Sequence, residues 1–94
     1  MPFYEIAEMK ESQSKLNSAI TRKTVAGELM KAGIVTKEEG AGPPLHMHPN
    51  EEQFVLVLEG KLHYIVGDEE RIAQKGDLIH IPRNTNHRSR ARWR

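Results

Sequence analysis

Short apolar segments alternate with turn-forming residues along most of the chain. The apolar, β-branched run at residues 53–58 is followed by Gly60 and then by a second run at residues 61–66. Further segments at residues 71–74 and 78–82 are bounded by glycine, aspartate and proline. Runs of about four to eight residues with a turn roughly every 8 to 12 residues indicate an all-β sandwich or barrel.

Two of the turns carry specific expectations. Glu59 and Gly60 separate two strand-like runs, and this pattern predicts a hairpin between them. Pro82, Arg83 and Asn84 predict a second turn, in which Asn84 takes the positive φ that most residues resist.

Residues 1–24 are polar and weakly patterned. We interpret them as an N-terminal arm that needs a partner surface, and residues 25–94 as the barrel domain. A length of 94 residues is enough for one domain with a small core.

Composition narrows the class of protein. Apolar residues make up 37% of the chain, which is lean for a globular domain but too apolar for disorder. The longest apolar run, at residues 54–58, is far shorter than the ~20 residues of a membrane span. The absence of cysteine excludes disulfides and thiolate metal sites, and the start of the chain lacks a signal-peptide pattern. We therefore expect a cytoplasmic protein with no membrane segment.

Charge is unevenly distributed along the chain. The net charge is +1, but residues 83–94 hold five arginines and no acid. Four of them alternate with other residues, so a strand would place His87, Ala91 and Trp93 on one face and these arginines on the other: Arg88, Arg90, Arg92 and Arg94. We expect the histidine face to point inward. One arginine strand with a single aromatic residue is a weak signal for nucleic-acid binding, so a solvated, dimer-facing or substrate-steering surface is preferred.

His46 and His48 are the first candidates for chemistry. Their spacing puts both imidazoles on one face of an extended strand, as a shared metal ion requires. The pair alone is also compatible with an ordinary polar surface.

The surrounding residues resemble the two sequence motifs of the cupin family. The first motif, G-x5-H-x-H-x3-4-E-x6-G, is matched at Gly40, His46, His48, Gln53 and Gly60. The second, G-x5-P-x-G-x2-H-x3-N, is matched at Gly76, Pro82 and His87, with Asn84 in place of the glycine and Ala91 in place of the asparagine. The resemblance implies a small jelly-roll β-barrel in which His46, His48 and His87 bind one divalent metal ion.

The resemblance leaves the fourth ligand open between two residues. Six residues before Gly60 stands Gln53, whereas the spacing from His48 also admits Glu52. We favour Gln53, because the strand has a fixed rise and parity while the preceding loop can absorb a residue. A neutral amide leaves the charge of the ion uncompensated and favours an anionic ligand. Such a set suits nickel, iron, manganese, zinc, cobalt or copper.

We therefore expect a metal-dependent enzyme that acts on a small anionic sugar acid, keto acid or enol by isomerisation, hydrolysis or oxygenation. The alternative is a non-catalytic module that binds or senses such a ligand. The catalytic candidates are Glu52, His63 and His80, although polar strand surface is the simpler interpretation of the two histidines and solvated loop that of Glu51 and Glu52. Tyr64 is interpreted as core. Cupins usually continue beyond the point where this chain ends, so the truncated C-terminal edge is open, is covered by a neighbouring subunit, or belongs to a longer protein. We expect a homodimer, because an uncovered edge strand invites pairing.

Overall fold

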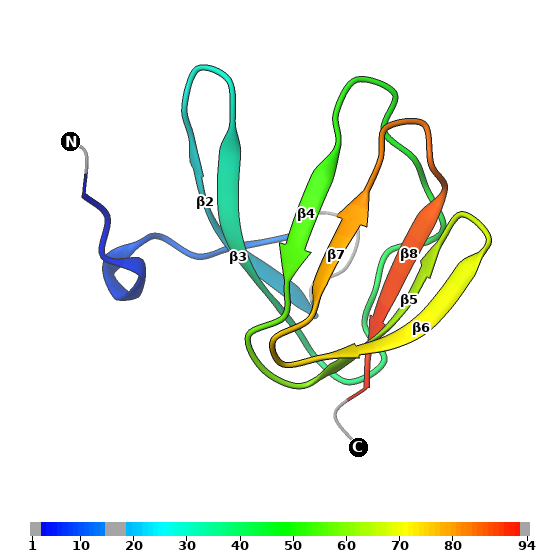
Figure 1. The fold of residues 1–94 in the computed structure, drawn as a ribbon. Helices are drawn as coiled ribbons and strands as arrows, with labels where there is room; N and C mark the ends of the chain where they lie inside the picture. The colour runs from blue at the N-terminus through cyan, green and yellow to red at the C-terminus, as the bar shows by residue number, and fades with distance from the viewer. Residues whose placement is uncertain (1–2, 15–18, 93–94) are drawn as a thin grey trace.

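The computed structural model describes residues 3–14 and 19–92, and its regular structure is almost entirely β-strand (Figure 1). The elements are the 3₁₀ turn η1 (Ile6–Glu8) and the strands β1 (Ser12–Gln13), β2 (Ile20–Ala26), β3 (Lys31–Lys37), β4 (Gln53–Leu56), β5 (Lys61–Val66), β6 (Glu69–Gln74), β7 (Leu78–Ile81) and β8 (His87–Ala91). The predicted all-β class is confirmed. No helix among the described residues is long and apolar enough to cross a membrane.

The strands form three antiparallel sheets. Their orders are β1-β2-β3, β4-β7 and β6-β5-β8, and no hydrogen-bonded pair of described strands joins one sheet to another. In Figure 1 the β4-β7 pair stands between the β2-β3 ribbon and the β6-β5-β8 sheet. The barrel is therefore open rather than closed.

The hydrophobic core lies between the β4-β7 pair and the β6-β5-β8 sheet. Its buried members are Val57, Tyr64, Ala73 and Ile81, with Val55, Leu62, Val66 and Ile79 packed against them. On β7 the two isoleucines of this set alternate with outward side chains, as a half-buried strand requires. The core is small, so each of these side chains carries an appreciable share of the folding free energy.

The hairpin predicted at Glu59 and Gly60 is wrong. β4 pairs with β7 and β5 pairs with β6 and β8, so the chain changes sheets between residues 56 and 61. Val57 continues this pairing into the turn before β7, because its N–H donates to Asp77 O at 3.0 Å and its carbonyl accepts from Gly76 N at 2.9 Å. Gly60, at φ 80°, then redirects the backbone.

The N-terminal boundary falls within a strand. β2 runs over Ile20–Ala26, so the division expected between residues 24 and 25 lies inside it. Where the domain begins remains a prediction. The expected turn at Asn84 is present, with φ 61°.

Side-chain burial alternates along β8, as the alternation in its sequence predicts. His87, Ser89 and Ala91 are buried, whereas Arg88 and Arg90 between them are partly exposed. The inward histidine is thus confirmed within β8, while Trp93 and Arg94 lie outside the described residues.

Candidate metal centre

The segment that carries the first two histidines runs antiparallel to β8. At one end Gly40 N donates to Ala91 O at 2.8 Å, and at the other end His46 and His87 exchange backbone hydrogen bonds of 3.1 and 2.8 Å. Gly42 lies so close to β8 that a Cβ there would sit 1.8 Å from Ser89 O. Only glycine permits this approach, which brings His46 directly opposite His87.

His48 is held by the loop that precedes β8. Its carbonyl accepts from Asn84 N at 2.9 Å, and the three imidazoles then meet in one cluster. The ring centroids of His46 and His87 are 4.2 Å apart, and those of His48 lie 5.1 and 5.5 Å from them. One nitrogen of each ring lies within 4.8 Å of the other two. The structure thus brings together the three histidines that the motifs identify.

Each ring has its Nδ1 atom turned toward an oxygen of a nearby residue. His46 Nδ1 is 2.7 Å from Pro44 O, and His87 Nδ1 is 2.9 Å from Thr85 O. Because a carbonyl only accepts, both Nδ1 atoms carry the proton and Nε2 keeps its lone pair. His48 Nδ1 lies 3.5 Å from Glu51 Oε1, which favours the same tautomer.

This donor set fits a divalent transition metal. Three neutral imidazoles with Nε2 lone pairs, each oriented by an oxygen at Nδ1, form the usual environment of histidine-bound metals. Burial lowers the pKa of His87, and the nearby His46 and His48 lower it further against the opposing effect of the Thr85 carbonyl. The neutral, metal-binding form of His87 is therefore favoured. Nitrogen atoms bound at about 2.1 Å can lie at most about 4.2 Å apart, so small ring rotations would bring all three onto one ion.

Gln53 and Glu52 lie on opposite faces of the β4 region. Gln53 is paired with the buried Ile81 and shares its face with Val55, which packs against the core. Glu52 turns the other way, where its Oε1 lies 2.8 Å from His80 Nε2. Only Gln53 therefore has its side chain on the inner face, and its role as a ligand remains a proposal.

The three catalytic candidates lie outside the histidine cluster. His80 is paired with Glu52 and stacks on Phe54 with 4.5 Å between ring centroids. His63 Nε2 lies 2.5 Å from Glu70 Oε1 on the β5-β6 hairpin. None of the three is among the described acidic and histidine side chains that could share a metal ion.

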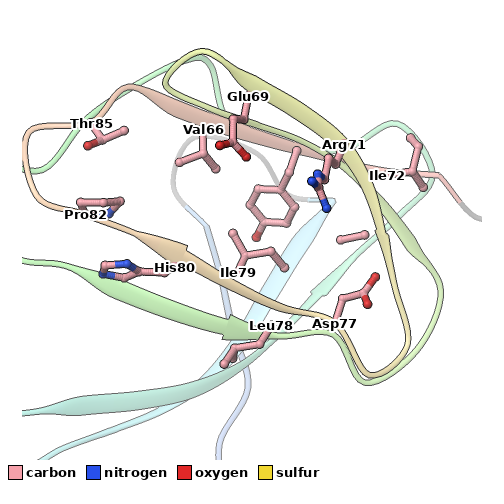
Figure 2. Close-up of a pocket in the computed structure, with 12 residues that line it drawn as sticks. Val66, Glu69, Arg71, Ile72, Asp77, Leu78, Ile79, His80, Pro82 and Thr85 are labelled. Carbon is pink, nitrogen blue, oxygen red and sulfur yellow. The ribbon is translucent and has the colours of Figure 1, made fainter.

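A pocket of about 620 Å³ adjoins the cluster without including its histidines (Figure 2). Val66 and Thr85 line it, and these residues also border His87, through strand pairing and through the Thr85 carbonyl. Figure 2 shows Arg71 and Ile79 projecting into this space from β6 and β7. The volume is that of a small-molecule site.

Sequence reasoning missed a polar group inside the fold. Lys37 Nζ lies 2.5 Å from Ser89 Oγ, and Ser89 also hydrogen-bonds the Tyr64 side chain. Ser89 shares the inner face of β8 with His87, so strand parity could have indicated its position. The contact with Lys37 joins segments 52 residues apart and carries no local signal.

The sequence profile of the cupin domain matches residues 33–92, which is more than half of the chain. The chain belongs to the cupin family. This confirms the family to which its two motifs pointed.

Two curated relatives of this cupin are longer proteins. Quercetin 2,3-dioxygenase from Bacillus subtilis (strain 168) is 33% identical over 61 residues, which cover 65% of this chain and 18% of that protein. Oxidoreductase iacF from Pestalotiopsis fici is 40% identical over 48 residues, covering 50% of this chain and 24% of that protein. The matched segment of this cupin therefore spans less than a quarter of either relative.

Solved structures share the fold over nearly all of this cupin. KdgF from Halomonas sp. superposes with a TM-score of 0.85 at 26% identity and covers 97% of this chain and 82% of its own. An RmlC-like cupin from Shewanella frigidimarina has a TM-score of 0.78 at 17% identity, and the match covers 97% of this chain and 80% of that chain. The Cnp3 cupin domain of Schizosaccharomyces pombe has a TM-score of 0.77 at 19% identity, and the match covers 96% of this chain and 64% of that chain. The fold is thus the jelly roll of cupins, with its sheets open.

Proposed function

We propose that this cupin binds one divalent transition metal ion through His46, His48, Gln53 and His87 and acts on a small oxygenated anion. The observation that carries the proposal is the convergence of three imidazoles whose Nδ1 atoms all face oxygen, which leaves Nε2 for the metal. Nickel, iron, manganese, zinc, cobalt and copper all suit this donor set.

The bound metal would polarise an oxygen of a sugar acid, keto acid or enol and so support isomerisation, hydrolysis or oxygenation. The chain's own residues orient the rings, through Pro44, Thr85 and Glu51. The partly apolar pocket beside His87 provides space for the organic part of the substrate. The names of the two curated relatives, a dioxygenase and an oxidoreductase, support redox chemistry as one of these options.

Metal content tests the proposal. Protein purified without a metal-affinity tag should contain close to one equivalent of metal by ICP-MS, and His48→Ala should lose most of it. His63→Ala is the matched control, since His63 is paired with Glu70 away from the cluster. Equal metal in wild type and His48→Ala would reject the proposal.

A non-catalytic binding or sensing module is the second candidate. The open arrangement of the sheets favours it, because an unclosed barrel shields a reaction from water less well. Thermal-shift screening with sugar acids and keto acids, followed by a turnover assay on each hit, separates the two. Binding without product would support the module, and product formation would reject it.

A further inference from the structure

A row of hydrogen-bond donors crosses the inner face of the β6-β5-β8 sheet beside the histidine cluster. Strand pairing sets Tyr64 opposite Arg71 on one side and opposite Ser89 on the other, so these side chains point the same way. Lys37 of β3 extends the row through its bond to Ser89 Oγ. We call these four residues the donor row: Arg71, Tyr64, Ser89 and Lys37.

We propose that the donor row binds the carboxylate of a small organic acid. The inference rests on the proposed function in one respect, namely that this acid is the substrate whose other end lies at the histidine cluster. Neither the motifs nor the proposed metal ligands include the residues of the donor row.

The position of the donor row suits such a ligand. His87, Val66 and Glu69 are paired across the three strands and form the row next to the donor row. Ser89 lies two residues beyond His87 on the same face of β8. Two residues of strand correspond to about 7 Å. Tyr64 and Arg71 also line the pocket of about 620 Å³, so a ligand in that pocket reaches both rows.

Arg71 and Tyr64 are the members of the donor row that line the pocket. Within the described part of the chain Arg71 makes no salt bridge, and Figure 2 shows it directed into the pocket. Tyr64 is 8% exposed, and burial raises the pKa of its hydroxyl so that it keeps its proton as a donor. A guanidinium, a hydroxyl and an ammonium are the groups that recognise carboxylates in proteins.

Charges near the donor row support the same sign of ligand. Burial, together with the nearby Arg22, lowers the pKa of Lys37 to about 8, and a bound anion would oppose this shift. Two acids line the same pocket. Asp77 is engaged in the β6-β7 turn, where its Oδ2 accepts from Gln74 N at 2.8 Å, and Glu69 lies one row away, opposite Val66.

Calorimetric titration with glutarate tests the inference on metal-loaded protein at pH 7. This five-carbon dicarboxylate is long enough to bridge rows about 7 Å apart. We expect saturable binding of one glutarate per chain, no competition from the neutral glutaramide, and a Kd at least about 10-fold weaker in Arg71→Gln and in Lys37→Met. Arg71→Gln should fold normally, because Arg71 is an exposed residue on an edge strand.

Arg88→Gln is the matched control, since it removes the same charge from the outer face of the same sheet. Its Kd should stay within about twofold of wild type. The inference is overturned if wild type does not bind glutarate, or if Arg71→Gln binds it as tightly as wild type does. It is equally overturned if Arg88→Gln weakens binding as much as Arg71→Gln does. The weaker binding would then reflect the loss of one positive charge anywhere on the sheet and not a contact made by Arg71.

Metal analysis of the same samples separates this inference from the proposed function. Normal metal content with binding that does not depend on Arg71 rejects the donor row alone. Metal content no higher than that of His48→Ala, together with Arg71-dependent glutarate binding, rejects the metal site and supports the donor row.

Discussion

At the scale of single residues, local oxygen atoms decide what each imidazole can do. Pro44 and Thr85 each lie two positions before the histidine whose Nδ1 they contact, so the tautomers of His46 and His87 are set within their own segments. Glu51 is the corresponding partner of His48. Such partners hold a ring in one orientation and contribute to metal affinity.

Replacement of Gln53 by glutamate should strengthen metal binding. The added negative charge on the inner face of β4 offsets the charge of the ion, and roughly tenfold tighter binding corresponds to about 1.4 kcal/mol. Competition with a chelator measures the change. Glu52→Gln is the control and should leave metal affinity unchanged, because Glu52 contacts His80 on the outer face. A loss of metal in Glu52→Gln but not in Gln53→Ala would show that Glu52 is the ligand.

Lys37 should make stability rise with pH in the mildly alkaline range. Its pKa is about 8 in the folded protein and about 10.5 when unfolded, so between these values the unfolded state binds more protons. The free energy of unfolding should therefore increase by about 1–2 kcal/mol from pH 8 to 10, allowing for partial exposure.

Chemical denaturation of wild type and Lys37→Met across this range measures the effect as a difference. Lys37→Met should lack the rise. Parallel curves for the two proteins would show that the folded pKa of Lys37 is not lowered.

At the scale of elements, the approach of residues 40–46 to β8 builds the cluster. Backbone hydrogen bonds at both ends of the segment set the register that places His46 opposite His87. A change in this register would separate the two imidazole rings even if all the proposed metal-binding residues were kept.

Substitution of Gly42 by alanine should damage both stability and the proposed metal site. The new methyl would collide with the backbone oxygen of Ser89, which cannot rotate away, and overpacking of this kind costs about 1–3 kcal/mol. Thermal unfolding and ICP-MS report the two losses. Gly27→Ala is the control, since its nearest contact would be an ordinary 3.6 Å to Met30 O. An unchanged melting temperature in Gly42→Ala would contradict the close approach.

At the scale of the whole molecule, the outer face of the β4-β7 pair is unusually apolar. Phe54, Leu56 and Leu78 are 64%, 57% and 63% exposed and lie together by strand pairing. A contiguous apolar surface of this kind is typical of protein–protein contacts. The homodimer expected from the sequence at the C-terminal edge remains a prediction, and the structure points to this apolar face instead as its contact surface.

Sedimentation analysis of Leu56→Asp tests that prediction. We expect wild type to sediment as a dimer and Leu56→Asp to shift to monomer, because a buried carboxylate without a partner opposes association. Leu29→Asp is the control, since Leu29 is 95% exposed in the β2-β3 turn and should not affect the dimer. A monomeric wild type would show that the expectation is wrong.

The sequence by itself determined the features that depend on spacing along one segment. The alternation in β8 indicated that His87 is inward, the Pro82–Asn84 turn carried its positive φ, and the two motifs identified the family and the three histidines. These follow from the fixed parity of strands and the conformational limits of turn residues.

Tertiary structure alone decided which segments meet. It placed β4 and β5 in different sheets where a hairpin was expected, turned Glu52 toward His80, and joined Lys37 to Ser89. Strand pairing is determined by packing between residues distant in the chain, so it cannot be predicted from the local sequence of each strand.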